Sequence, residues 1–444
     1  MTNRSDILLD LIKETKKHGA DHVDTLLIDT TALNYSQRLG QQEQLERSES
    51  NEIGLRVFIG KKQSIVSSTD FSSSSLKNLI DRAISMAKSV PDDPFSRIAN
   101  LDEITSSVPD LQIYDPDEPS IEDLIQKANE FENAARSVPG ITNSEGANAA
   151  WQKTEIYQAT SNNFMNSYKT TRHYFGGSVI AQSDQGMERD YEFSSAIYAK
   201  DLANPSLIGQ LAGEKTVKRL NPKKPQTTKL PVVFHPREGR QLLGHFASAI
   251  NGAAISLGTS FLKDKMGQSV FPKTITIIDD PHRIKGLRSV PFDSEGIAAK
   301  KTSIIDQGIL TTWLLDLNTA QKLNLKSTGH AKRGPSSLPH PSASNLYIAP
   351  DTLSVTDLLK DIKEGLYVTD LIGHGINLVT GDYSIGAVGF WIKDGIITYP
   401  VSELTIASNL KDMFANLTVA NDLEFQYGID VPTLRIESMT IAGQ

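Results

Sequence analysis

YKTTRHYFGGSVIAQ (168–182) indicates the fold class, because it lies in a segment that favours strands over helices. Residues 141–200 are rich in Thr, Tyr, Phe and Ser, which suit a pleated and half-buried surface. We therefore expect several antiparallel strands here, with a bend or bulge of the ladder at Gly176-Gly177.

Amphipathic helices are expected on both sides of these strands. Apolar residues at helical spacing predict helices over residues 5–19, 72–90, 120–138, 204–220 and 237–251. The helix at 120–138 opens on Ser120 with Asp123 three residues later, which is close to a capping box. Strands are expected at 22–28, 230–235, 368–373 and 432–443, and hairpins at 55–68, 301–317 and 387–401. The pattern predicts an α+β protein with mixed, largely antiparallel sheets flanked by helices.

The 444 residues exceed one average domain, and NPKKPQTTKL (221–230) is the best candidate for a boundary. This stretch is polar and carries two prolines, as connectors between domains often do. We predict an N-terminal α+β domain over residues 1–225. A β-rich C-terminal domain, a sheet with helices, is expected over residues 231–444.

Composition excludes several classes of function. A net charge of −8 at pH 7 argues against nucleic acid and anionic membranes as partners. The absence of cysteine removes disulfides, thiolate catalysis and every zinc site that needs a sulfur ligand. No 18 apolar residues run together, and the N-terminus has no signal-peptide pattern. We expect a soluble, cytoplasmic protein.

The first candidate for chemistry is FHPREGRQLLGHF (234–246), which offers His235, Glu238 and His245. Two imidazoles and a carboxylate could hold zinc, and a glutamate could act as a general base. A zincin helix, however, places its two histidines four residues apart on one face. Here they are ten apart, with His235 at the end of a strand, so a structural function is favoured for both.

Acidic residues make TIIDDPHRIKGLRSVPFDSEG (276–296) the second candidate. Asp279, Asp280, Asp293 and Glu295 could form an acid/base pair or an oxygen-ligand cation site. The alternative is that Asp-Asp-Pro and Asp-Ser-Glu-Gly are turns in which Asp caps its own backbone. Turn chemistry favours this second interpretation.

The third candidate is the loop STGHAKRGPSSLPHPSASNLYI (327–348), which is rich in Gly, Ser and Pro. Long ordered loops are often functional. His330, Lys332 and Arg333 could form a substrate loop, in which the two cations bind a carboxylate such as a peptide C-terminus. A solvated connector is the alternative.

The C-terminal half resembles the TldD/PmbA family, and the N-terminal half agrees with it more weakly. The resemblance lies in the runs GTSFLKDKMGQSVFPKTITIIDDPHRIKGLRSVPFDSEG (258–296), DQGIL (306–310), LKSTGHAKRGPS (325–336), SNLYIAP (344–350) and PTLRIESMTIAG (432–443). The family has two kinds of subunit. TldD carries a His-Glu-x-x-x-His segment and a later cysteine that hold zinc, and TldE, also called PmbA, does not.

In this sequence the metal segment falls on RQLLGH (240–245), where only His245 is kept. Arg240 replaces the first histidine, and a guanidinium stays protonated and cannot ligate a metal. Gln241 replaces the glutamate, and an amide cannot act as a general base. The cysteine expected before Pro432 is absent from DLEFQYG (422–428). The resemblance is therefore to the TldE kind.

This resemblance implies a non-catalytic subunit without a cofactor, paired with a TldD-like metallopeptidase subunit that holds the zinc. The implied substrates are unfolded peptides and small proteins, and a homodimer is possible when the chain is alone. Two alternatives stay open: a hydrolase in its own right, or a regulatory binding protein without peptidase activity. We expect pairing through the C-terminal domain, with Trp313, Leu314 and Leu315, or Phe390 and Trp391, as candidate apolar contacts.

Overall fold

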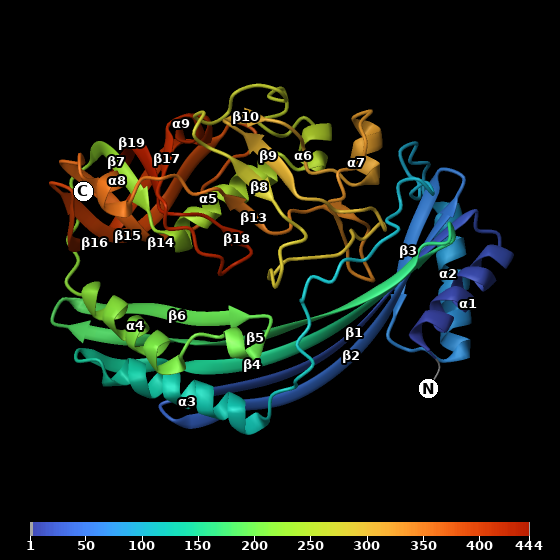
Figure 1. Cartoon of the computed structure of the whole chain (residues 1–444), viewed down its shortest axis with the longest axis horizontal. Helices are drawn as coiled ribbons and strands as arrows, with labels where there is room; N and C mark the ends of the chain where they lie inside the picture. Colours follow the sequence, from blue (N-terminus) through green and yellow to red (C-terminus); the bar gives the residue numbers. More distant parts are fainter. Residues whose placement is uncertain (1–2, 444) are drawn as a thin grey trace.

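The computed structural model describes residues 3–443, and its N-terminal half is built on one long, curved antiparallel sheet (Figure 1). The strand order is β3-β2-β1-β4-β5-β6. The strands are β1 (His22–Arg38), β2 (Gln41–Ile59), β3 (Lys62–Ser68), β4 (Ile141–Thr160), β5 (Met165–Ser183) and β6 (Gly186–Ala196).

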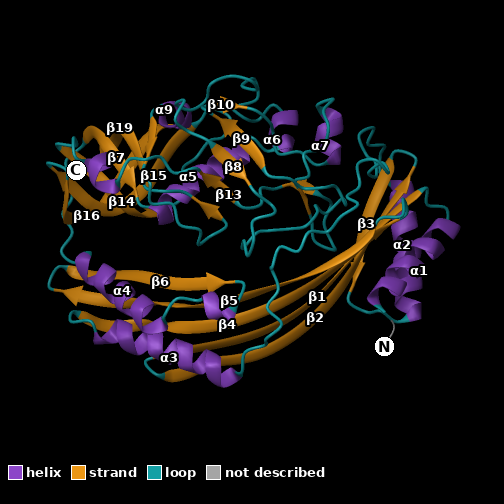
Figure 2. Ribbon diagram, in the orientation of Figure 1, coloured by secondary structure: helices purple, strands orange, loops and turns teal. Residues whose placement is uncertain are grey.

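Four helices cover one face of this sheet, and the C-terminal half lies over the other (Figures 1 and 2). The alternation of side chains along a strand explains the division. Odd-numbered residues such as Leu27 and Leu33 in β1, or Trp151 and Ala159 in β4, pack against the helices. The helices are α1 (Arg4–Lys17), α2 (Ser73–Ser89), α3 (Ile121–Ser137) and α4 (Pro205–Lys218), with the 3-10 turn η1 (Ala199–Asp201) before α4.

Two sequence expectations for this sheet need correction. The strand expected at 22–28 runs on to Arg38 and turns at Leu39-Gly40, both of which have positive φ. The ladder passes through Gly176 and Gly177 without a bulge, and the register shifts lie in β4 instead. Gly177 is needed for close packing, since a Cβ there would lie 2.6 Å from the Phe131 ring. The capping box of Ser120 at the start of α3 is confirmed.

The C-terminal half contains a six-stranded mixed sheet in the order β16-β15-β14-β7-β19-β17. An additional pairing between β16 and β19 closes it on itself. Its strands are β7 (Thr228–Phe234), β14 (Glu364–Ile372), β15 (Asp382–Lys393), β16 (Ile396–Asn409), β17 (Leu417–Val419) and β19 (Leu434–Ala442).

A smaller five-stranded sheet in the order β10-β9-β8-β13-β18 lies beside it. Its strands are β8 (Ile277–Asp279), β9 (Thr302–Asp306), β10 (Ile309–Leu310), β13 (Leu346–Ile348) and β18 (Ile429–Asp430), and β11 (Ala331–Lys332) pairs with β12 (His340–Pro341). The helices of this half are α5 (Pro236–Ala249), α6 (Gly252–Ser256), α7 (Leu317–Lys322), α8 (Val355–Leu359) and α9 (Leu410–Ala415).

The largest hydrophobic core lies in this half, and it includes the apolar face of α5. Trp313, Leu314, Leu315 and Trp391 belong to the same core and are at most 7% exposed. The expectation that these four residues form an intersubunit contact is therefore wrong, because this chain itself buries them. Phe390 is half-buried.

The α+β class with mixed and antiparallel sheets is confirmed. The long sheet is complete before residue 220 and the C-terminal sheets begin at β7, and we propose that the two domains divide between these points. Among residues 3–443, no helix is long and apolar enough to cross a membrane.

Candidate functional site

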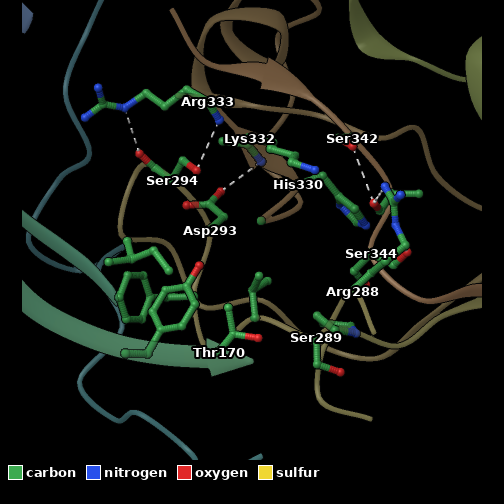
Figure 3. Close-up of a pocket in the computed structure, with 18 of the residues that line it drawn as sticks. Thr170, Arg288, Ser289, Asp293, Ser294, His330, Lys332, Arg333, Ser342 and Ser344 are labelled. Carbon is green, nitrogen blue, oxygen red and sulfur yellow. Dashed lines mark hydrogen bonds between the residues drawn. The ribbon is translucent and has the colours of Figure 1, made fainter. Parts of the chain in front are cut away.

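A cavity of about 380 Å³ lies between the long sheet and the loops of the C-terminal half (Figure 3). The sheet contributes the even-numbered residues of β1, β4 and β5, which point away from the helices. These residues are Leu26, Ile28, Ile156, Gln158, Tyr168, Thr170 and Arg172. The second and third candidate segments of the sequence supply the opposite wall, through residues 279–294, 329–333 and 342–344.

Aromatic contacts hold the acidic segment against the sheet. The ring of Phe292 meets Phe164 at 5.2 Å and Tyr168 at 5.4 Å between ring centroids, both edge to face. Edge-to-face pairs at this separation are favourable because the positive ring edge meets the negative ring face. They fix one wall of the cavity to β5.

The acidic residues of this segment are used within the protein. The Asp293 carboxylate accepts the backbone N–H groups of Glu295, Ile297 and Ala331. Asp280 accepts the N–H of His282. These are the turn contacts that the Asp-Asp-Pro and Asp-Ser-Glu-Gly patterns predict. Burial raises the pKa of Asp293 to about 6, against the lowering effect of its three hydrogen bonds.

His330 and Asp279 form a buried pair at the cavity wall. His330 Nε2 lies 3.1 Å from Asp279 Oδ2, and its Nδ1 lies 2.8 Å from the Thr328 hydroxyl. Asp279 also accepts the Ser344 N–H at 2.8 Å and the Ser344 hydroxyl at 2.6 Å. These contacts use both ring nitrogens of His330 and both carboxylate oxygens of Asp279. We therefore infer that the pair has a structural function and holds the loop in place.

A buried ion network joins the two halves beside the cavity. Arg333 Nη2 donates to Asp24 Oδ1 at 2.6 Å, and Arg56 Nη1 lies 3.6 Å from Asp24 and 3.5 Å from Glu295. All four side chains are at most 4% exposed. Burial raises the pKa of Glu295 to about 8, despite the attraction of Arg56. Arg333 thus has a carboxylate partner inside the protein, whereas Lys332 of the same loop lines the cavity.

Three further cations line the cavity wall, and they differ from Arg333 in their partners. Arg172 comes from β5, Arg288 from the acidic segment and Lys332 from the long loop. Figure 3 shows Arg288 and Lys332 on the loop side, across from Thr170 of the sheet. Within residues 3–443, none of the three forms an ion pair with a carboxylate. Loop composition pointed to Lys332, but nothing in the sequence singled out Arg172.

The first candidate segment lies elsewhere, on α5. His235 is the N-cap of this helix, and its Nδ1 accepts the Arg237 N–H at 3.1 Å. Burial lowers the pKa of His235 to about 4, so the ring is neutral. Glu238 accepts the Gln241 amide at 2.6 Å, and burial raises its pKa. His235 and His245 are not brought together as a pair: one caps α5 and the other lies against Tyr383.

Residues 240–245, onto which the family's metal segment falls, make contacts within the chain that do not suit a zinc site. The Arg240 guanidinium lies 4.6 Å from the centre of the Tyr427 ring, and its Nε donates to the Arg237 carbonyl. His245 Nε2 is buried and finds no hydrogen-bond partner in the described part of the chain. A permanently charged guanidinium and an amide nitrogen are not zinc ligands, so these residues do not fit the metal. Across residues 3–443, no three His, Cys, Asp or Glu side chains are grouped to hold a metal ion.

Sequence models of the PmbA/TldA metallopeptidase match three parts of the chain: domain 1 at residues 23–87, the central domain at 114–220 and the C-terminal domain at 227–443. The chain belongs to the PmbA/TldD metallopeptidase family. It is 37% identical to metalloprotease PmbA of Escherichia coli O157:H7, across 96% of this chain and 93% of that protein. The likeness makes it a PmbA-type member of the family.

Solved structures show the same fold at lower identity. A candidate modulator of DNA gyrase from Bacteroides thetaiotaomicron matches with a TM-score of 0.93 and 24% identity, over 100% of both chains. TldE from Thermococcus kodakarensis matches with a TM-score of 0.88 and 19% identity, over 98% of this chain and 100% of that one. In this PmbA-type chain, domain 1 and the central domain of the family share one continuous sheet, since β1 pairs with β4.

Proposed function

We propose that the chain is a non-catalytic subunit of a TldD/TldE-type zinc metallopeptidase complex that degrades or trims unfolded peptides and small proteins. In this proposal a TldD-like partner supplies the zinc and the hydrolytic step. The observation that carries it is the local structure of residues 240–245, where Arg240 and Gln241 take the places of the first histidine and the glutamate of the family's metal segment and make contacts within the chain.

The contacts of α5 support this proposal beyond the identity of the residues. Arg240 stacks on Tyr427, which lies in the stretch where the family places its cysteine. Arg237, one turn earlier, donates to Asp190 of β6 at 2.8 Å and lies over the Tyr191 ring. Because both guanidinium groups are engaged by the chain itself, α5 connects the two halves where a catalytic helix would present ligands.

The cavity supports a direct contact with substrate. It is bordered by both halves, has apolar and cationic walls, and lies within the 300–1,000 Å³ range typical of ligand sites. A subunit that has lost its metal ligands but keeps such a cavity can still hold part of a peptide. We propose that it helps to form the substrate chamber of the complex.

The decisive experiment is coexpression with a TldD-like chain that carries an intact His-Glu-x-x-x-His segment. We expect size-exclusion chromatography to show one mixed species that cleaves an unfolded peptide. Elemental analysis after dialysis should find zinc in the partner and none in stoichiometric amount in this chain alone, because functional zinc sites bind tightly.

Two outcomes would contradict the proposal. About one zinc per isolated chain, with peptide cleavage, would make the protein a peptidase in its own right. Separate elution at micromolar concentration, with the partner fully active alone, would rule out a subunit function. A partner in which alanine replaces the glutamate of its metal segment is the matched control, and it should pair normally but cleave nothing.

A further inference from the structure

We propose that Arg172, Arg288 and Lys332 form a subsite for the C-terminal carboxylate of a peptide, and that the last side chain of that peptide packs on the apolar wall beside them. The peptide nature of the ligand rests on the proposed function. The anion-binding character of the subsite rests only on the structure.

The position of Arg288 is set by main-chain carbonyl groups. Its Nε donates to the Ser344 carbonyl and its Nη2 to the Ala343 carbonyl, both at 2.9 Å. Neutral carbonyl oxygens orient a guanidinium without cancelling its charge. The head group is therefore held in place on the cavity wall, and its positive charge stays available.

The other two cations add like charge to the same space. Partial burial lowers the pKa of Arg172 and of Lys332, and in both cases the second cause is repulsion by Arg288. No carboxylate contributes to either shift. Arg172 belongs to the long sheet and the other two to the C-terminal loops, so the folded protein brings these charges together against their repulsion. A bound anion would remove that repulsion.

The acids that line the cavity cannot serve as that anion. Asp279 attracts Arg288, but its two oxygens already accept from Ser344 and face His330. Asp293 is capped by three backbone N–H groups. The net character of the wall is therefore cationic, and a carboxylate or a phosphate is the complementary chemistry.

Apolar residues next to the cations favour a peptide end over a free inorganic ion. Ile28, Ile156, Tyr168, Leu287 and Phe292 line the same cavity. A volume of about 380 Å³ suits the last residues of an extended chain and is too small for a folded domain. A peptide that ends in leucine presents a carboxylate and an apolar side chain together. The carboxylate can bind the three cations while the side chain packs on the apolar residues.

Fluorescence anisotropy on the full chain tests this subsite. The probe is an unstructured Gly/Ser peptide that ends in leucine and carries a fluorophore at its N-terminus. We expect the same peptide with a C-terminal amide to bind about tenfold more weakly or worse, since a charge-assisted hydrogen bond is lost. Arg172→Gln and Lys332→Gln should each weaken the free-acid peptide to a similar extent and leave the amide unchanged. Arg172→Lys, which keeps the charge, should retain most of the affinity.

Arg136→Gln is the matched control, since Arg136 is exposed on α3 at the helix-covered face, and it should bind like the wild type. Equal binding of acid and amide peptides would overturn the subsite. Displacement of the peptide by inorganic phosphate at micromolar concentration would assign the site to phosphate and overturn the peptide assignment. Either result leaves pairing with a zinc-bearing partner intact, so failure here is distinguishable from failure of the proposed function.

Discussion

The metal segment on α5 and the cavity between the two halves handle positive charge in opposite ways. On α5, Arg237 pairs with Asp190 and Arg240 lies on Tyr427, so each cation has a partner within the chain. In the cavity, Arg172 and Arg288 repel each other, and in the described part of the chain neither forms an ion pair with a carboxylate. Charge that the fold itself satisfies indicates a structural function, whereas charge that the fold leaves unsatisfied indicates a ligand.

The largest effect is expected from breaking the ion network that borders the cavity. Asp24→Ala leaves Arg333 and Arg56 buried beside each other without their shared carboxylate. Removing one partner of a buried ion pair costs about 3–5 kcal/mol, and we expect that loss in the free energy of unfolding. Urea titration followed by circular dichroism measures it.

Asp10→Ala is the control for this variant, because Asp10 is an exposed residue of α1, and it should change stability by less than about 0.5 kcal/mol. If Asp24→Ala were as mild, the network would contribute little. Arg333 and Arg56 would then resemble Arg172 and Arg288 of the cavity. The contrast between cations that the chain pairs and cations that it leaves unpaired would fail.

The second largest effect on stability is expected at Glu295, and this effect depends on pH. Its pKa in the folded protein is raised to about 8, so between its usual value and pH 8 the folded state binds more protons than the unfolded state. Stability should therefore fall as pH rises through this window, by at most about 1.4 kcal/mol per pH unit. Glu295→Gln mimics the protonated acid and should flatten this dependence. Urea midpoints at several pH values test it, and parallel curves for the two proteins would refute the assignment.

Local signals in the sequence were enough to predict the five longest helices, α1 to α5, and most turns. Ser120 and Asp123 placed the start of α3, because capping and helical spacing act over a few residues. The second half of β1 and the start of β2 were missed. Residues 41–51 of β2 are exposed on both faces, so they show no alternation of apolar and polar side chains. The turn between them places Leu39 at positive φ, where Gly or Asn is the usual signal.

The cavity could be predicted only in part, since it joins residues far apart in the sequence. Loop composition identified His330, Lys332 and Arg333 together, but only the tertiary structure separates them. Arg333 pairs with Asp24 and His330 lies against Asp279, which leaves Lys332 facing the cavity. Arg172 has the pattern of an ordinary strand residue, because the feature that sets it apart is electrostatic repulsion by Arg288 of the C-terminal half, which only the tertiary structure reveals.

The third prediction concerns repair of the metal segment. We expect the double variant Arg240→His, Gln241→Glu to show no zinc-dependent peptidase activity. Histidines at positions 240 and 245 lie about 140° apart around a regular helix, so sharing one ion would require a distorted helix and a third ligand, and the cysteine expected before Pro432 is absent. The new glutamate would also stand beside Glu238, which now accepts the Gln241 amide.

This variant should also lose about 0.5–2 kcal/mol of stability with the contact between Arg240 and Tyr427. Elemental analysis and a peptide-cleavage assay are the measurements, and Gln241→Glu alone is the control. Zinc-dependent cleavage by the double variant would mean that a further residue near α5 completes a zinc site. Residues 240–245 would then still be able to support catalysis, contrary to the structural function that their contacts indicate.

The smallest effect is expected at His245, the one residue of the metal segment that the chain keeps. Its Nε2 is buried without a hydrogen-bond partner in the described structure, and its ring meets Tyr383 edge to face at 6.2 Å. Burial lowers its pKa, so below its usual value the unfolded state takes up a proton more readily and stability falls as pH falls.

His245→Phe keeps the ring contact and removes both the unsatisfied nitrogen and the titration. We expect a change in the free energy of unfolding of less than about 1 kcal/mol at pH 7, towards higher stability, and a flatter dependence below pH 6.5. Pairing and cleavage with the TldD-like partner should be unchanged. Loss of activity in the mixed complex with the fold intact would show that His245 still takes part in the chemistry of the complex, and that α5 and the cavity are two functional sites.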